Sequence, residues 1–133
     1  METYNCYYYQ ASSGRCPVEE FVDSLSEPSC RQYFSKVDLL ETFGQQLPTP
    51  HAKKIESREK IYELRFNDRA GAVRVLYFFF DGNNIIFTNA FVKKTQKTPR
   101  KEIETAIKRK RLFLIYKLEK KSVRKHISKL KKK

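Results

Sequence analysis

The chain has 133 residues, of which 40% are hydrophobic, and its 28 Lys and Arg residues against 15 Asp and Glu residues give a formal net charge of +13. This length suits one domain, and the apolar content excludes a chain that is disordered throughout. The sequence has no signal-peptide pattern and no run of roughly 18 apolar residues, so we expect a cytoplasmic protein without a membrane segment.

The first third of the chain predicts a strand followed by two helices. Residues 4–9 are aromatic enough for a short strand. Pro17 suits the first position of a helix, whose apolar residues recur at helical spacing until Pro28 interrupts them. A second helix is expected over about residues 29–43, with Gly44 as its C-terminal stop. Together these two helices form a predicted helical hairpin.

The remainder predicts a meander of strands and a last helix. Residues 45–60 contain two prolines and mixed charge, and we expect them to be a connector. Three strands follow, at about 61–67, 72–80 and 85–92, separated by the turn sequences DRAG and DGNN. Thr98 and Pro99 are typical of a helix start, and we expect this helix to end near residue 121.

The order β-α-α-β-β-β-α predicts an α+β fold in which an antiparallel sheet packs on helices. We expect one domain over residues 1–121. Residues 122–133 are almost all basic with isolated apolar residues, and they are expected to form a flexible tail.

The first turn of the meander predicts a pair of arginines. A loop of two or four residues within DRAG places Asn67 opposite Ala72. Counting back along the antiparallel pair then sets Arg65 opposite Arg74, on the same face of the sheet.

The second turn adds a lysine to these arginines. A loop of two or four residues within DGNN places Phe80 opposite Ile85 and Arg74 opposite Phe91. Lys93 continues on the same face, because side chains alternate along a strand. A single bulge in this hairpin would move half of these side chains to the other face.

The two faces of the meander therefore differ in character. One is nearly all apolar and is expected to take the helices: Leu64, Phe66, Val73, Val75, Tyr77, Phe79, Ile86, Ala90 and Val92. The other gathers its cations at one end of the sheet: Glu63, Arg65, Arg74, Leu76, Phe78, Asn89, Phe91 and Lys93. Arginines are also common on the solvated face of an antiparallel sheet, so a purely structural role stays open for each.

The basic residues are concentrated near the C-terminus. Residues 93–133 hold 18 basic and 3 acidic residues, whereas residues 1–92 hold 10 basic and 12 acidic residues. Positive charge that is concentrated in one part of the chain favours binding to a polyanion. Nucleic acid fits better than a membrane surface, because the basic region lacks a broad apolar face. Clustered Arg and Lys suit phosphate, including metal-free cleavage of RNA by its 2′-hydroxyl.

Other catalytic and metal-binding patterns are absent from the sequence. Cys6, Cys16 and Cys30 are odd in number and lack a C-x-x-C spacing, so neither a disulfide framework nor a metal site is expected. His51 in the connector and His126 in the tail do not form an evident catalytic pair, and His51 is expected to be a loop residue. We predict no cofactor.

Several motifs carry a resemblance to a known family. The stretches IYELRF, VRVLYFF and FVKKTQKTPRKEIETA, preceded by GRCPVEEFVDSL, resemble the RelE superfamily of bacterial toxins, in particular its HigB-like, phage-derived branch, over about residues 4–116. The resemblance implies the same β-α-α-β-β-β-α fold. It also implies a ribosome-dependent endoribonuclease that cuts messenger RNA in the decoding site and is inhibited by an antitoxin, usually a helix-turn-helix protein.

The resemblance also implies roles for individual residues. Arg65, Arg74 and Lys93 match motif positions expected to bind phosphate and promote cleavage. We assign Arg74 to transition-state charge, Arg65 to substrate positioning, and Lys93 to proton transfer or phosphate contact.

Further residues are predicted to bind substrate, namely Lys94, Phe91 and Lys97. The chain also departs from the pattern, since relatives often carry His just before the Phe of F-x-K-K, where this chain has Asn89-Ala90. The basic tail extends beyond the usual end of the family, and it can contact ribosomal RNA or the antitoxin or remain solvated. Two alternatives stay open: a non-catalytic RNA- or DNA-binding module, and a degenerate toxin that only binds its antitoxin.

Overall fold

A computed structural model describes residues 3–69, 71–116 and 123–126 of the chain. Its helices are α1 (Pro17–Asp23), α2 (Glu27–Phe43), a 3-10 turn η1 (Gly44–Gln46) and α3 (Arg100–Tyr116). Its strands are β1 (Asn5–Tyr9), β2 (Ala52–Glu56), β3 (Ile61–Asp68), β4 (Gly71–Phe80), β5 (Asn84–Lys93) and β6 (Val123–His126). Within these residues, no helix is long and apolar enough to cross a membrane.

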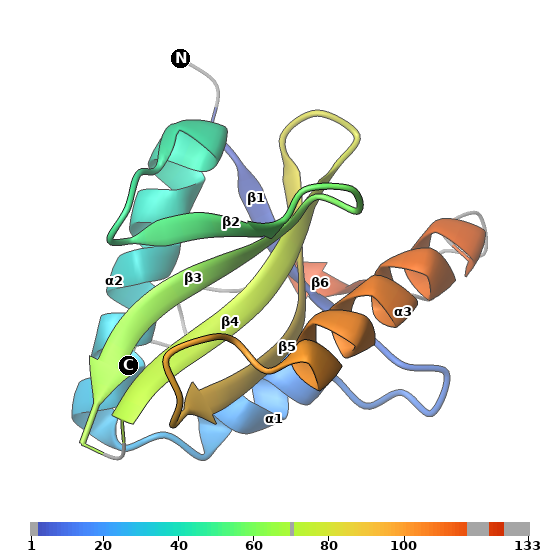
Figure 1. Cartoon of the computed structure of the whole chain (residues 1–133). Coiled ribbons are helices and arrows are strands. Elements are labelled where there is room, and N and C mark those ends of the chain that lie inside the picture. The colour runs from blue at the N-terminus through green and yellow to red at the C-terminus, as the bar shows by residue number, and fades with distance from the viewer. Residues whose placement is uncertain (1–2, 70, 117–122, 127–133) are drawn as a thin grey trace.

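The six strands form one sheet in the order β2-β3-β4-β5-β1-β6. Strands β2 to β5 are an antiparallel meander, β1 runs parallel to β5, and β6 pairs antiparallel with β1. Helices α1 and α2 lie on one face of the sheet and α3 lies on the other (Figure 1). The predicted α+β class is confirmed, and the predicted strands and helices follow one another in the expected sequence.

Three features differ from the expectations. The sheet is mixed, because β1 is not joined to β5 by a turn and nothing in the local sequence forces the two strands to be antiparallel. The helices cover both faces, because the second face also carries apolar residues that α3 buries. The connector contains β2, a short edge strand with exposed lysines. The two prolines of the connector precede β2, so they remove no hydrogen bond from its pairing with β3.

Helix α2 is bounded by residues with clear local roles. It begins two residues earlier than expected, because Pro28 in the first turn lacks only an N–H that has no helical partner there. The Ser26 side chain caps this end by accepting a hydrogen bond from the Ser29 N–H at 3.4 Å. Gly44 ends the helix with φ +53°, and a Cβ at this position would overlap the ring of Tyr4.

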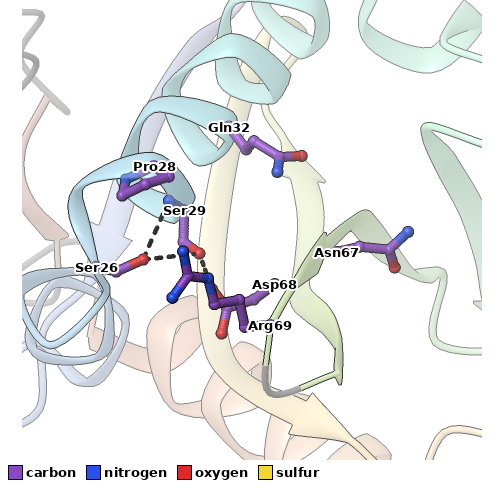
Figure 2. A pocket seen from close by; sticks show the side chains of 7 residues that line it. All are labelled: Ser26, Pro28, Ser29, Gln32, Asn67, Asp68 and Arg69. Carbon is purple, nitrogen blue, oxygen red and sulfur yellow. Dashed lines mark hydrogen bonds between the residues drawn. The ribbon is translucent and has the colours of Figure 1, made fainter.

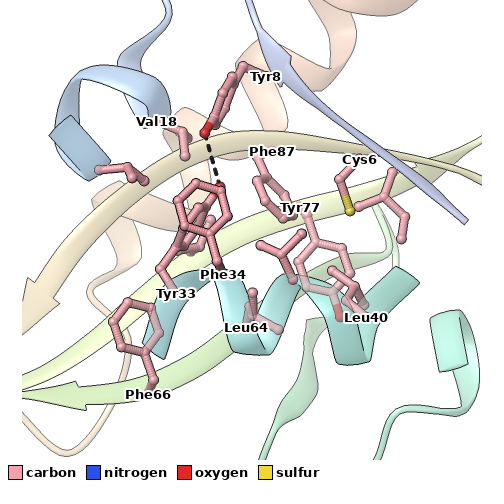
Figure 3. Packing of buried hydrophobic residues seen from close by; sticks show 14 of the residues in the cluster. Cys6, Tyr8, Val18, Tyr33, Phe34, Leu40, Leu64, Phe66, Tyr77 and Phe87 are labelled. Atoms are coloured by element: carbon pink, nitrogen blue, oxygen red, sulfur yellow. Dashed lines mark hydrogen bonds between the residues drawn. The ribbon is translucent and has the colours of Figure 1, made fainter. Parts of the chain in front are cut away.

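The core between α1, α2 and the sheet is largely aromatic (Figure 3). Tyr33 of α2 is fully buried against the rings of Phe34, Phe66 and Phe87, and its hydroxyl donates to the Tyr8 hydroxyl at 3.4 Å. This packing fixes α2 across the sheet beside the C-terminal half of β3.

The hairpin of β4 and β5 contains two local deviations that cancel. Its loop has three residues, not two or four, so Phe80 pairs with Asn84 and the expected pairing with Ile85 is wrong. Further along, Leu76 pairs with Asn89 and Tyr77 with Phe87, which leaves Thr88 as an extra, bulged residue.

The bulge is stabilised from two sides. Arg109 of α3 donates to the Thr88 carbonyl at 2.8 Å, and the Thr88 hydroxyl lies 3.2 Å from the Leu76 carbonyl oxygen. Because of the bulge, Ile86 lies in the cluster beneath α3 and not on the face where we predicted it. Beyond the bulge, the predicted pairing of Arg74 with Phe91 is restored and confirmed.

The C-terminal region is described only in part. Four residues of the segment expected to be a flexible tail form β6 beside β1. Residue 122 and residues 127–133 lie outside the described residues, as does the end of the last helix that we expected near residue 121.

Candidate active site

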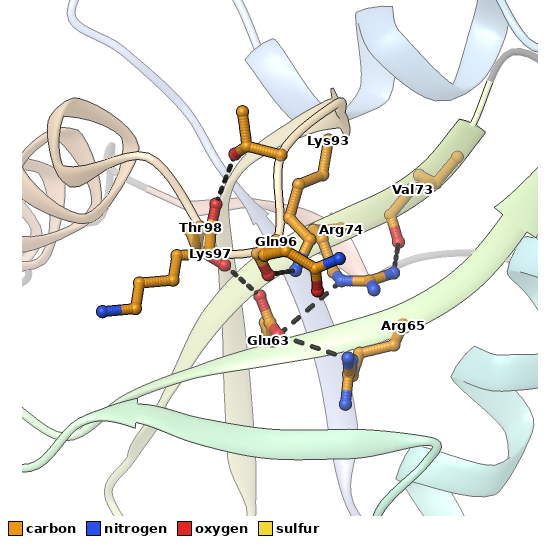
Figure 4. Close-up of polar contacts among 9 residues, drawn as sticks. Glu63, Arg65, Val73, Arg74, Lys93, Gln96, Lys97 and Thr98 are labelled. Carbon is orange, nitrogen blue, oxygen red and sulfur yellow. Dashed lines mark hydrogen bonds and ion pairs between the residues drawn. The ribbon is translucent and has the colours of Figure 1, made fainter.

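The three predicted catalytic cations lie together at one end of the sheet. Arg65 of β3 pairs directly with Arg74 of β4, as the first turn predicted. Lys93 is the last residue of β5 and pairs with Ala72, two residues before Arg74. The structure therefore brings three cations from three adjacent strands to one surface (Figure 4).

A buried carboxylate lies at the centre of these cations. The Glu63 side chain is 3% exposed, and its Oε2 lies 3.4 Å from Arg65 Nε and 3.6 Å from Arg74 Nε. Its Oε1 accepts a hydrogen bond from the Thr98 hydroxyl at 2.7 Å, just before α3 (Figure 4). We call Glu63, Arg65, Arg74 and Lys93 the cationic cluster. One carboxylate thus links β3, β4 and the segment that leads into α3.

Arg74 is the most buried cation of the cluster, with a side chain that is 8% exposed. Its Nη1 donates to the Val73 carbonyl at 2.9 Å. Among the described residues, the buried Nε atoms of Arg65 and Arg74 form no hydrogen bond, although both lie at ion-pair distance from Glu63. Desolvation lowers the pKa of Arg74, the charge of Glu63 raises it and that of Arg65 lowers it. Arginine nevertheless remains protonated in proteins.

Lys93 lies partly buried at the edge of this cluster. Its Nζ donates to the Gln96 carbonyl at 2.8 Å, so the loop after β5 folds back over the lysine. Desolvation and the charge of Arg74 lower the pKa of Lys93, and the smaller contribution of Glu63 opposes them. Lys93 is therefore easier to deprotonate than an exposed lysine.

The two arginines line a pocket of about 290 Å³ that we call the phosphate pocket. Its other lining residues come from α2, the loop before β2, and β3: Gln32, Lys36, Pro50, Phe66 and Asn67. Three cationic side chains thus converge on a single small cavity.

Lys36 is a lining residue of this pocket that sequence reasoning missed. The apolar stripe of α2 predicts only the side chains that face the core, whereas Lys36 lies beside that stripe. Its Nζ lies 2.7 Å from Nδ1 of His51. An ammonium group only donates, so Nδ1 of His51 is the acceptor in this contact. His51 lies in the turn before β2, as expected for a loop residue.

The predicted substrate-binding residues do not join the cluster in the same way. Phe91 is half-buried against the core beneath α3, so its ring is not a free stacking surface. Lys94 is exposed beyond the end of β5. Lys97 is exposed, and its ammonium group points away from Arg65 and Arg74 (Figure 4).

Asn89 and Ala90 stand where relatives often carry His just before the Phe of the F-x-K-K motif. Asn89 is buried, and its Nδ2 donates to the Glu102 carbonyl at 3.1 Å and to Glu102 Oε1 at 3.0 Å. In this chain the residue therefore attaches α3 to the sheet. Across the described ranges, no group of three or more His, Cys, Asp or Glu side chains is arranged to hold a metal ion.

Comparison with known proteins identifies the family. The model of the phage-derived protein Gp49-like family (DUF891) matches residues 20–111, which is more than half of the chain and includes the whole cationic cluster. The chain belongs to the Gp49-like family. The resemblance to the HigB-like, phage-derived branch of the RelE superfamily is thereby confirmed.

Two curated proteins are similar to part of this Gp49-like protein. Both are named "Probable endoribonuclease HigB1" and come from Mycobacterium tuberculosis, strains CDC 1551 / Oshkosh and ATCC 25618 / H37Rv. Each is 39% identical over 56 residues, which cover 42% of this chain and 44% of the relative. The match thus spans less than half the length of these curated relatives.

Proposed function

We propose that this Gp49-like protein is the toxin of a type II toxin-antitoxin system and an endoribonuclease that cleaves messenger RNA on the ribosome. The observation that carries the proposal is the pair of arginines beside Lys93, held by the buried carboxylate of Glu63. The Gp49-like family and the names of the mycobacterial relatives support the same activity.

The phosphate pocket provides the binding step. Arg65 and Arg74 present guanidinium groups from adjacent strands, and guanidinium binds phosphate oxygens with two parallel hydrogen bonds. Arg65 is the more exposed of the two, which suits positioning of the incoming phosphodiester. Arg74 is nearly buried, where its charge acts strongly on the oxygens that become more negative in the transition state.

Cleavage follows by attack of the neighbouring 2′-hydroxyl. The 2′-oxygen bonds to phosphorus while the bond to the 5′-oxygen breaks, which gives a 2′,3′-cyclic phosphate and a 5′-hydroxyl. The 2′-hydroxyl gives its proton to a base, for which solvent water or a phosphate oxygen serves, and the leaving 5′-oxygen gains a proton from a general acid. Lys93 is our candidate for the donor of that second proton, because its lowered pKa makes proton release easier than from an exposed lysine.

The proposed partners follow from the proposed activity and from charge. The substrate is messenger RNA on the ribosome in the cytoplasm, and the basic C-terminal region favours contacts to ribosomal RNA. The cognate inhibitor is an antitoxin, for which a helix-turn-helix protein is our candidate.

Induced expression with mapping of messenger 5′ ends tests this proposal. We expect growth arrest and new 5′ ends in translated messages with the wild-type protein, and loss of both with Arg74→Ala. Arg15→Ala serves as the matched control, because Arg15 is an exposed arginine paired with Glu20 away from the cluster. Retention of cleavage by each of Arg65→Ala, Arg74→Ala and Lys93→Ala would reject the assigned site.

A non-catalytic nucleic-acid-binding module is the second candidate, and the basic charge of residues 93–133 favours it. Such a protein binds RNA or DNA with an affinity that falls steeply with salt and leaves the nucleic acid intact. A degenerate toxin instead co-purifies with an antitoxin and causes no growth defect. The same induction experiment separates both from an endoribonuclease, because neither produces new 5′ ends.

A further inference from the structure

A second pocket adjoins the phosphate pocket. It has a volume of about 280 Å³ and shares two lining residues with the phosphate pocket, Gln32 and Asn67. Its remaining lining residues lie at or next to the start of α2 and the end of β3: Ser26, Pro28, Ser29, Asp68 and Arg69 (Figure 2). Because the two pockets share Gln32 and Asn67, they adjoin between α2 and β3, and we call the two together the groove.

The walls of this groove follow from regular secondary structure. Ser29, Gln32 and Lys36 recur at helical spacing along one side of α2. Arg65 and Asn67 are alternate residues of β3, so their side chains leave the strand on the same side. The groove therefore runs from a cationic end at Lys36 and Arg65 to an uncharged middle at Gln32 and Asn67.

The floor of the second pocket is held in place by hydrogen bonds. The buried Ser29 hydroxyl donates to Asp68 Oδ1, and Ser26 caps α2 beside it (Figure 2). This contact ties the start of α2 to the end of β3. In contrast, the carboxamides of Gln32 and Asn67 are exposed and form no hydrogen bond to the residues that the structure describes. They are free to bind a ligand in a pocket whose walls are fixed.

We propose that this second pocket is the subsite for the nucleobase next to the phosphate held by Arg65 and Arg74, and that Gln32 and Asn67 contact the edge of that base. The inference rests on the proposed endoribonuclease function. The phosphate and the base of one nucleotide are joined through a single ribose, which matches two small adjoining pockets. Each pocket volume lies near the lower end of the range for small-ligand sites, as expected for one base or one phosphodiester.

The chemistry of the shared residues favours a base over a second phosphate. A carboxamide offers one acceptor and two donor hydrogens, which matches the paired donors and acceptors on the edge of an unstacked base. Single-stranded RNA is read in this way, through base edges that are splayed out of the helix. Asp68 and Arg69 line the same pocket with opposite charges, so it lacks the excess of cations that a second phosphate would require.

The first experiment maps cleavage sites for Gln32→Ala, Asn67→Ala and the double variant. We expect the preference for one base beside the cut to fall by about tenfold for each lost pair of hydrogen bonds, while cutting continues at other sites. Gln45→Ala is the control, since Gln45 is an exposed glutamine at the opposite end of α2, in η1. Variants that cut with the same base preference as the wild-type protein would overturn the subsite.

The second experiment does not depend on catalysis. Ribose phosphate and the 3′- and 5′-monophosphates of the four nucleosides are titrated into purified wild-type protein and the double variant, with circular dichroism to verify folding. We expect at least one nucleotide to bind the wild-type protein about tenfold more tightly than ribose phosphate, and the double variant to lose this difference. Equal binding of every nucleotide and ribose phosphate to the wild-type protein would overturn the subsite. Nucleotide preference without any RNA cleavage would instead overturn only the proposed function.

Discussion

Substitution of Glu63 by Gln tests whether the buried carboxylate holds Arg65 and Arg74 in their positions. Glutamine preserves the size of the side chain and still accepts a hydrogen bond from Thr98, so the change removes little except the negative charge. We expect the variant to be less stable and to lose RNA cleavage, because the two arginines then repel each other without a counter-charge.

The magnitude follows from burial. The side chains of Glu63 and Arg74 are 3% and 8% exposed, and removal of one partner of a buried ion pair costs about 3–5 kcal/mol. The Arg65 side chain is 24% exposed, so water screens its contact with Glu63, and neither contact has hydrogen-bond geometry. We therefore expect a loss near the lower value, about 3 kcal/mol. For a domain of this size, that loss lowers the melting temperature by about 10 °C.

Thermal and urea unfolding of the purified proteins measure this loss, and cleavage is assayed well below the melting temperature of the variant. Glu20→Gln is the control, because Glu20 pairs with Arg15 on the exposed surface, where an ion pair contributes little. A Glu63→Gln protein as stable and active as the Glu20→Gln protein would refute the role given to the carboxylate.

Four further predictions concern Lys93, Gly44 and Asn89. Lys93→Arg should lose cleavage while it retains RNA binding, since arginine keeps the charge but does not release a proton; equal cleavage rates would limit Lys93 to phosphate contact. Because folding lowers the pKa of Lys93, the unfolded chain binds more protons at alkaline pH. The unfolding free energy of the wild-type protein should thus rise relative to that of Lys93→Met as pH increases toward 10.5, in urea titrations. Gly44→Ala should cost about 2–3 kcal/mol in urea unfolding, because φ is positive there and Cβ overlaps Tyr4, and an unchanged midpoint would contradict this. Asn89→Ala should cost about 1–2 kcal/mol in the same assay through the lost bonds to Glu102, and a neutral effect would show that α3 is held otherwise.

The pairing of Arg65 with Arg74 was predictable because a tight turn fixes the register of the strands that it joins. The second hairpin was less predictable. Its three-residue loop uses Asp81 and Gly82 with positive φ, which the sequence DGNN permits but does not require. The bulge at Thr88 then restores the register, so the predicted pairing of Phe91 is correct, whereas the predicted face of Ile86, which precedes the bulge, is wrong.

The sequence predicts Glu63 only as one acidic residue on the basic face of the sheet, and not as the buried carboxylate between Arg65 and Arg74. Glu63 and Arg65 share a face by alternation, but Glu63 is held in its buried position by Thr98, which approaches from far along the chain. Lys36 and Gln32 were missed for a similar reason, because the groove exists only where α2 lies beside β3. Local sequence patterns predict helices, strands and the two faces of a sheet. A pocket between elements that are distant in the sequence can be predicted only when the packing of those elements is known.

Analysis of the cut ends in a purified translation system tests the central claim most directly. Messenger RNA, ribosomes and the purified protein are combined, and the termini of the fragments are identified for the wild-type protein and for Arg74→Ala. Our account predicts fragments with 2′,3′-cyclic phosphate and 5′-hydroxyl ends that require wild-type protein and ribosomes and disappear with Arg74→Ala. Intact messenger with the wild-type protein, or the same fragments with Arg74→Ala, would contradict it.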